Sequence, residues 1–266
     1  MKNKFLWLLL LPFLFSLFFV SCKEEAHQNI NIEQVDNPAA WNILSLGMGT
    51  IGVIDKDVIR VYYLNEKNQW ILDRVSSFII PEGNRGVLGL GLGYIGVIHE
   101  DTMDFYHLDA QNLWKKENRM MFVMPENYDR IMTVKFPWEI GVIGVENDGI
   151  IEFYYLDDRY IWQNDETASF VLPEGIDDYF SIGSMVIGIV SDSKLGFYFL
   201  TDEEGWMFYE DFVLRLPDDY DGLIPFEQNV IGVLKDDRIK FFEVDFNDDQ
   251  WIIDETMNFY LPELSD

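Results

Sequence analysis

Cysteine is almost absent from this chain, which has one cysteine, Cys22, in 266 residues. A single cysteine excludes an intrachain disulfide, so the fold must be held together by its core. The chain is long enough to bury a sizeable core, and aromatic residues make up 16% of it. The sequence therefore predicts a globular domain stabilised by apolar packing.

Basic residues are also scarce, with 19 Lys and Arg against 47 Asp and Glu and a formal net charge of −28. Nucleic-acid binding and charge-driven adhesion to an anionic membrane surface both require clustered Lys and Arg. The composition argues against both classes of function. A strongly negative surface favours solubility and attracts cations or basic partners.

Residues that often carry catalysis or bind metals are few. The histidines are His27, His99 and His107, and there is no G-x-S-x-G turn or recognisable Ser-His-Asp order. No cysteine lies near these histidines and the sequence contains no EF-hand loop, so we expect no bound metal. The alternative is a zinc site formed by His99 and His107 with Glu100 or Asp101. The glycines of the LGLGLG run at 88–93 are not followed by a helical pattern, so we expect no cofactor.

The first 21 residues have the pattern of an export signal. Lys2 and Lys4 precede an almost wholly apolar run over 5–20, which ends at the small residue Ser21. That run is shorter than the about 20 apolar residues that a membrane-spanning helix needs. We therefore interpret 1–21 as a signal peptide and exclude it from the fold.

Ser21-Cys22 resembles the attachment site of bacterial lipoproteins, in which a small residue precedes the cysteine that becomes the lipidated first residue of the mature chain. The resemblance implies that acyl chains such as palmitate on Cys22 anchor the protein in a lipid bilayer, and two or more chains make such an anchor stable. Phe19 departs from the Leu that is usual three places before the cysteine. The alternative is a free or buried cysteine after an ordinary signal.

Lys23, Glu24 and Glu25 resemble the lysine-plus-acidic-pair export tag of surface lipoproteins in bacteroidete-type Gram-negative bacteria. This three-residue resemblance implies an outer-membrane protein on the cell surface; a protein on the periplasmic leaflet is the alternative. For the residues themselves, the alternative is a solvated linker. We expect residues 22–39 to form a polar tether.

Residues 40–266 consist of five similar units with a period of about 44 residues. Each unit contains Ile-Gly-Val or Ile-Gly-Ile, an aromatic segment, a Trp, and a Pro that follows the Trp by 11 residues. We place the units at approximately 40–84, 85–128, 129–176, 177–220 and 221–266. The residues of this structural repeat are Gly52, Gly96, Gly144, Gly188 and Gly232, then Trp70, Trp114, Trp162, Trp206 and Trp251, and finally Pro81, Pro125, Pro173, Pro217 and Pro262.

The aromatic segment of each unit predicts the architecture. Large apolar residues stand nine and ten places after the glycine, as in Phe105 and Tyr106. Neighbouring strand residues point to opposite faces, so both faces of each sheet must be covered. Five four-stranded sheets packed face to face in a ring satisfy this requirement. The sequence predicts an all-β, five-bladed β-propeller; the alternative is another all-β repeat fold such as a solenoid.

Two details of the ring follow from the same pattern. A glycine inside a strand usually marks a close approach of backbones, so we expect the Ile-Gly-Val segments on or near the innermost strands. The units are whole, so closing the ring need not exchange a strand between the two ends of the chain. No unit has a long helical pattern, and we expect no helix after residue 40.

The five tryptophans allow two interpretations. They could form five equivalent ligand platforms, and the chain resembles five-bladed lectin-like propellers in repeat number and length. Packing between blades is the favoured interpretation, because large aromatic residues dominate protein cores.

An acidic residue directly follows the proline of each repeat unit, and the repeat places these five acids on one face of the ring. Further acids follow nearby, as in Asp129, Asp177 and Asp221. The face is a candidate surface for a cation or a basic partner, while turn chemistry and solubility are the favoured explanation. The candidate residues are Glu82, Glu126, Glu174, Asp218 and Glu263.

Taken together, these features predict a membrane-anchored surface lipoprotein whose propeller binds a glycan or protein ligand. One alternative is a glycan-acting hydrolase with carboxylates near the propeller channel. Another is an accessory subunit of an outer-membrane complex. The expected partners are the lipid bilayer, through Cys22, and a glycan or basic protein, with no nucleic acid.

Overall fold

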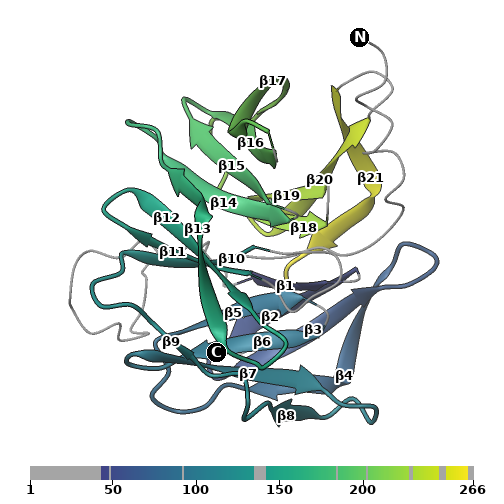
Figure 1. The fold of residues 1–266 in the computed structure, drawn as a ribbon. Helices are drawn as coiled ribbons and strands as arrows, with labels where there is room; N and C mark the ends of the chain where they lie inside the picture. The colour runs from purple at the N-terminus through teal and green to yellow at the C-terminus, as the bar shows by residue number, and fades with distance from the viewer. Residues whose placement is uncertain are drawn as a thin grey trace.

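A computed structural model describes residues 43–47, 49–91, 93–134, 142–183, 185–201, 203–227, 230–245 and 250–262. This part of the chain is all-β and forms a five-bladed β-propeller (Figure 1). It contains no helix, and therefore none that could cross a membrane. The predicted fold class is confirmed.

Each blade is an antiparallel sheet whose first four strands are consecutive in the sequence. The first blade comprises β1 (Ile43–Gly47), β2 (Thr50–Asp55), β3 (Val58–Leu64) and β4 (Trp70–Ile79). The second comprises β5 (Gly86–Gly91), β6 (Tyr94–Ile98), β7 (Thr102–Leu108) and β8 (Trp114–Lys116), with β9 (Phe122–Val123) also pairing with β7.

The other three blades repeat this plan without the interruption. The third comprises β10 (Arg130–Val134), β11 (Val142–Asn147), β12 (Ile150–Leu156) and β13 (Trp162–Val171). The fourth comprises β14 (Asp178–Gly183), β15 (Val186–Ser191), β16 (Lys194–Thr201) and β17 (Gly205–Arg215). The fifth comprises β18 (Gly222–Glu227), β19 (Val230–Lys235), β20 (Arg238–Asp245) and β21 (Gln250–Tyr260).

The first strand of every blade lies at the centre of the ring. β5 contacts β1 and β10, β14 contacts β10 and β18, and β18 contacts β1, so the five strands close a circle. Figure 1 shows these strands gathered in the middle of the molecule, with the later strands of each blade fanning outward. Because each sheet takes its strands from one stretch of chain, the described ring closes without a strand exchanged between the ends.

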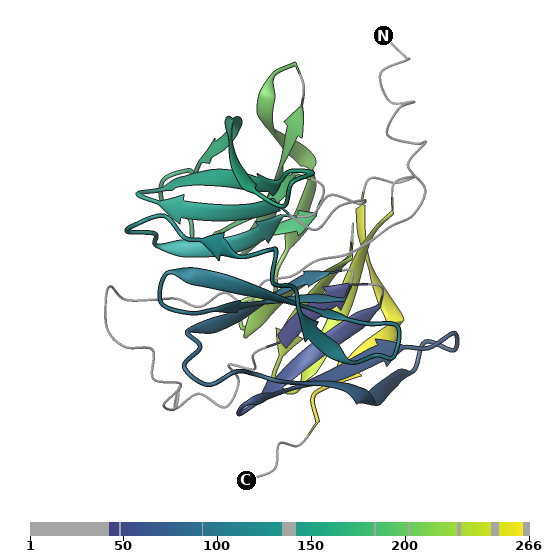
Figure 2. The same ribbon diagram turned by 60° about the horizontal axis from the view of Figure 1, so that its bottom comes forward.

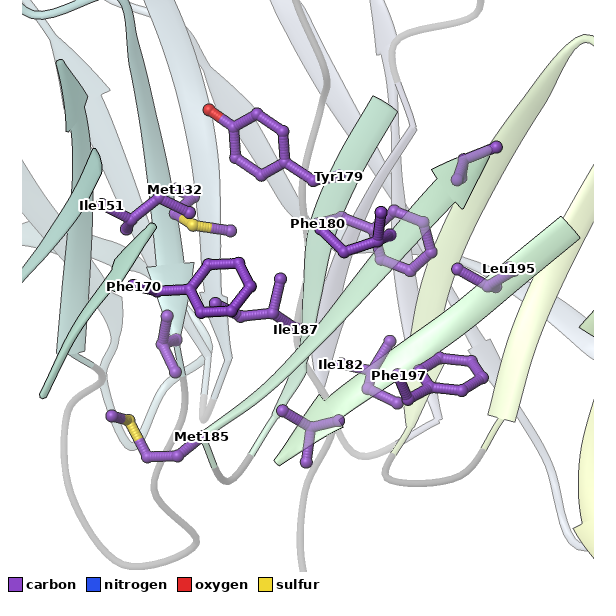
Figure 3. Close-up of a cluster of buried hydrophobic side chains, with 14 of the residues drawn as sticks. Met132, Ile151, Phe170, Tyr179, Phe180, Ile182, Met185, Ile187, Leu195 and Phe197 are labelled. Carbon is purple, nitrogen blue, oxygen red and sulfur yellow. The ribbon is translucent and has the colours of Figure 1, made fainter. Parts of the chain in front are cut away.

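The two aromatic positions of each unit cover opposite faces of the blade, as the pattern predicts. Phe105 packs against Trp162 of the following blade, with ring centroids 5.4 Å apart. Its neighbour Tyr106 packs against Phe78 of the preceding blade at 5.1 Å. The same alternation recurs around the ring, so each sheet is enclosed by two others. Figure 2 shows the sheets stacked in this way, and Figure 3 shows the apolar cluster between the third and fourth blades.

The Ile-Gly-Val segments form the second strand of each blade and not the innermost one. The missing Cβ of the glycine leaves room for a side chain of the same sheet. A Cβ added at Gly52 would lie 2.5 Å from Ile59 Cγ2, and one at Gly232 would lie 2.7 Å from Ile239 Cγ2. In the first, second and fifth units the nearest side chain is the one seven residues after the glycine. At Gly144 the nearest is Met132 on the first strand, at 2.6 Å, and at Gly188 Leu195 and Phe180 are equally near, at 3.0 Å. The close approach expected at the glycine is therefore between a side chain and the backbone within one blade.

The first and fifth blades close the ring without a covalent link. Tyr62 packs edge-on against Phe259 with ring centroids 5.3 Å apart. Asn68 Nδ2 donates to Thr256 Oγ1 at 2.8 Å, across 188 residues of sequence. Apolar residues of both blades share one buried cluster. The closing seam is therefore built from the same kinds of contact as the others.

Replacing Gly232 with Ala should destabilise the propeller, because the new methyl group overlaps Ile239. Overpacking of this kind costs about 1–3 kcal/mol, which urea denaturation would measure as a lower transition midpoint. Gly222→Ala is the matched control, since the nearest atom to its Cβ would be Leu234 Cδ2 at 4.0 Å. Equal stability of the two variants would contradict this role of the glycine.

Candidate functional site

Two sets of loops share one end of the strands and form what we call the acidic loop face. One set comprises the turns between the second and third strands, and the other comprises the connections that lead from one blade to the next. Backbone hydrogen bonds join them: Asp129 N donates to Glu146 O, Asp177 N to Val190 O and Asp221 N to Leu234 O, each at 2.8 Å. The post-proline acids lie in the connections, so the repeat brings them to this face.

The post-proline acids are exposed at every described position. The side chains of Glu82, Glu126, Glu174 and Asp218 all face solvent. None of the four makes a hydrogen bond or ion pair with another residue in the described part of the chain. Glu263 lies outside the described residues. These carboxylates are available to a partner.

The acids three residues further along the connections have a structural role. Asp129 Oδ2 accepts a hydrogen bond from Asp148 N at 2.9 Å, and Asp177 Oδ2 accepts one from Asp192 N at 3.1 Å. Asp221 Oδ2 likewise accepts from Asp236 N. A carboxylate that caps a turn satisfies an otherwise unpaired backbone donor. Turn chemistry therefore accounts for these three acids and leaves the post-proline acids unexplained.

One ion pair joins two loops of this face. Lys235 Nζ contacts Asp219 Oδ2, and both side chains are largely exposed. The hydrogen bond from Lys235 holds the pKa of Asp219 below its usual range, and the same bond raises the pKa of Lys235. An exposed pair of this kind contributes little to stability.

A second polar cluster lies beside the ring centre, where the third and fourth blades meet. Arg130 and Asp178 are the first residues of β10 and β14, and Arg130 Nη1 donates to Asp178 Oδ1 at 2.7 Å. The Arg130 guanidinium also lies 4.3 Å from the centre of the Tyr179 ring. Glu146 is the strand partner of Arg130. We call these four residues the inner cluster.

The inner cluster contains buried polar atoms without a partner. Arg130 Nε, Arg130 Nη2 and Tyr179 Oη are buried, and none has a hydrogen-bond partner within 3.5 Å. Burial raises the pKa of Tyr179 well above its ordinary value; Arg130 opposes this shift, while the charges of Glu146 and Asp178 and a hydrogen-bonding interaction with the Glu146 carboxylate add to it. Sequence reasoning missed this cluster, because Arg130 and Tyr179 stand at positions that vary between units.

His99 and His107, the two histidines in the described part of the chain, lie at different ends of the β6–β7 hairpin. His99 lies at the loop end of the β6–β7 hairpin, where Nε2 is 3.2 Å from Asp104 Oδ2. His107 pairs with Tyr94 near the other end of β7. No group of three metal-binding side chains occurs among the described residues. The alternative of a His99–His107 site with Glu100 or Asp101 is not supported, because the strand holds the two rings apart.

The described centre of the ring offers no pair of carboxylates for glycan hydrolysis. The middle residues of the innermost strands include Ser45, Thr133 and Ser181, which are fully buried. Among the described side chains of these strands, Asp178 is the one carboxylate, and it is paired with Arg130. Retaining and inverting glycosidases both need two carboxyl groups across the scissile bond.

The five tryptophans lie between blades, where each clamps its own blade to the preceding one. The Trp206 ring lies tilted against Phe153, with centroids 5.6 Å apart, and edge-on to Phe170 at 5.0 Å; its Nε1 donates to Ala168 O at 2.9 Å. Trp70, Trp114 and Trp251 make the equivalent hydrogen bonds, to Met257 O, Ser76 O and Phe212 O. Rings held in this way are not free platforms for a ligand.

Trp162 is the exception among the tryptophans. Its ring keeps the usual contacts, with Phe105 and Phe122 both at 5.4 Å. Its Nε1 is buried without a hydrogen-bond partner in the described part of the chain. In the second blade, which precedes the blade of Trp162, the outermost strand is interrupted between β8 and β9. The carbonyl that would accept from the Trp162 indole, by analogy with the other seams, belongs to this interrupted segment.

The remaining sequence predictions lie outside the described residues. These are the lipidation site Cys22, the export tag Lys23, Glu24 and Glu25, the signal peptide and the tether.

No protein-family model matches the chain, and no curated protein matches it. Matching solved structures include a Lactobacillus plantarum protein at 10% identity and TM-score 0.37, covering 78% of this chain and 67% of that one. Kluyveromyces lactis Hsv2 matches with 11% sequence identity and a TM-score of 0.41, and the match covers 80% of this chain and 59% of Hsv2. A candidate 6-phosphogluconolactonase of Bacteroides fragilis matches with 10% sequence identity and a TM-score of 0.38. The match covers 80% of this chain and 68% of that protein. This chain spans about three fifths of Hsv2, and likeness at this level carries no argument about function.

Replacing Trp70 with Phe should cost more stability than replacing Trp162 with Phe. The first change removes a hydrogen bond to Met257 O, whereas the second removes a buried donor that has no partner. A hydrogen bond contributes about 0.5–1.5 kcal/mol and an unsatisfied buried donor costs about 1–3 kcal/mol. Urea denaturation of both variants would measure the difference, and a larger loss for Trp162→Phe would refute the assigned role of the indole N–H.

Proposed function

We propose that this protein is a lipoprotein of the outer membrane, held at the cell surface by acyl chains on Cys22, whose propeller binds a basic partner at the acidic loop face. The fold is consistent with a binding or interaction module. The proposal depends on one observation above all. Four carboxylates at the same position of four blades are exposed and unpaired, while their neighbours are used in turns.

The chemistry of the face favours a cationic protein segment over a metal ion. Adjacent blades each contribute one free carboxylate, so the charges are spread around a rim and do not converge on one point. No metal-binding group occurs among the described residues. A partner with several Lys or Arg side chains could meet several of these acids at once. Many weak contacts then add up to useful affinity and a fast association rate.

The tether that the sequence predicts is long enough for the same arrangement. The chain between Cys22 and the first described residue, Ile43, is about 20 residues long, and a flexible segment of that length spans on the order of 25 Å. This reach is enough to hold the propeller clear of the bilayer. A face that is held away from the membrane can meet a soluble partner or the exposed part of a neighbouring membrane protein.

Neutralising the rim should weaken binding of a basic ligand. We would change the five post-proline acids to Gln or Asn and measure binding of a fluorescent oligolysine peptide by anisotropy at low salt. Exposed ion pairs contribute about 0.2–1 kcal/mol each, so the loss should be about tenfold or more. The changed residues are Glu82, Glu126, Glu174, Asp218 and Glu263.

A matched control separates the rim from net charge. It neutralises five exposed acids on the opposite loops and the outer strands, which changes the net charge by the same amount. If both variants lose affinity equally, or if neither does, the acidic loop face is not the binding site. The control residues are Glu66, Asp158, Glu166, Glu204 and Glu210.

Lipid attachment at Cys22 should be visible in a bacterial host given radiolabelled palmitate. The wild-type chain should carry label and sediment with membranes, whereas Cys22→Ala should carry none and appear in the soluble fraction. Changing Lys23, Glu24 and Glu25 to Ala should leave the label but protect the protein from protease added to whole cells. A Cys22→Ala protein that stays with the membrane would refute the anchor.

A further inference from the structure

The innermost strands begin with different residues in different blades. Arg130 and Asp178 begin β10 and β14, whereas Gly86 and Gly222 begin the strands on either side of them in the ring, β5 and β18. A Cβ at Gly86 would have its nearest contact at 3.7 Å, and one at Gly222 at 4.0 Å. The acidic loop face therefore has a charged pair at its centre, and the innermost strand to each side of the pair begins with a residue that has no side chain.

The buried atoms of the inner cluster require a hydrogen-bond acceptor. Tyr179 is only 7% exposed, and its hydroxyl lies near the Glu146 carboxylate but has no hydrogen-bond partner within 3.5 Å. Figure 3 shows that hydroxyl pointing away from the apolar side chains around the ring. Arg130 is held through Nη1, while its Nε and Nη2 donors are also without a partner. Buried groups of this kind are rare in folded proteins and each needs an explanation.

The charges around these donors limit what could satisfy them. An anion would meet the carboxylates of Glu146 and Asp178 and the acids of the surrounding face. A cation would meet the Arg130 guanidinium. A neutral acceptor remains, and a hydroxyl group suits the site better than a carbonyl, because a hydroxyl also donates and the two carboxylates are acceptors.

We propose that the inner cluster is a binding subsite for the hydroxyl groups of a neutral glycan. Arg130 and Tyr179 donate to one sugar oxygen, and Glu146 or Asp178 accepts from a neighbouring hydroxyl. This inference goes beyond the basic partner of the rim, since it assigns a different ligand class to the centre of the same face.

Access requires a movement of Arg130. The three unpartnered atoms lie beneath the surface, and the Arg130 side chain is still 14% exposed. Of its three guanidinium nitrogens, one is bonded to a described residue. Swinging the Nε–Nη2 edge outward while Nη1 keeps its contact with Asp178 would present both donors to a sugar at the ring centre.

The test is saturation-transfer NMR with the wild-type propeller and three probes, the methyl glycosides of glucose, galactose and mannose. At least one should show saturation transfer at millimolar concentration. Tyr179→Phe removes the hydroxyl alone, and Arg130→Lys keeps the charge beside Asp178 while removing the forked donors. Each variant should weaken binding about tenfold or more, which would abolish the signal.

Stability separates a binding role from a structural one. Tyr179→Phe should melt at about the same temperature as the wild type, because the buried hydroxyl that it deletes has no hydrogen-bond partner within 3.5 Å. Tyr154→Phe is the matched control; its hydroxyl donates to Glu152 on the outer strands, and its loss should leave glycoside binding unchanged. The rim variant should also keep glycoside binding, so the failure of one proposal does not entail the failure of the other.

Two results would overturn the subsite. One is the absence of saturation transfer with all three glycosides, which would leave the donors to an internal water molecule. The other is glycoside binding that survives both Tyr179→Phe and Arg130→Lys, which would place the sugar elsewhere on the propeller.

Discussion

The contact on which this propeller depends is the one between the tryptophan of each blade and the blade before it. A single four-stranded sheet here has large apolar side chains on both faces and cannot bury them alone. The indole ring packs against one or more aromatic rings of the preceding blade, and in four seams its N–H also donates a hydrogen bond to a carbonyl of that blade. Trp70 makes this contact across the closing seam, so the ring closes without a disulfide or an exchanged strand.

Because the contacts between blades stabilise the ring, the loops can differ in sequence from one blade to the next. The aromatic pair and the tryptophan of each unit are fixed by packing in the seam, and the glycine is fixed by side chains of its own blade that pack against it. The turns need only a few capping groups, such as Asp129 and Asp177. Acids that do neither task, such as Glu126 and Glu174, are free of structural constraint and can carry a function.

Repetition explains what the sequence could predict. Gly52 and its equivalents recur with Trp70 and its equivalents, which was enough to derive five blades and their order. It did not show that the glycine accommodates a side chain of its own blade, because periodicity does not identify a contact partner. It also could not separate Asp177, which caps a turn, from Glu174, which does not. Arg130 and Tyr179 were missed because they have no counterpart in the other units.

The last point has a physical basis. A ring of similar units tends to place the same side chain at equivalent positions, and five-fold packing is satisfied when it does. A ligand at the ring centre has no five-fold symmetry, so a site for it must break the repeat. The strand starts do so with Arg130 and Asp178 beside two glycines, and the orphaned donors of Arg130 and Tyr179 lie there. Divergence between repeats is therefore a better guide to a central site here than the residues that the repeats share.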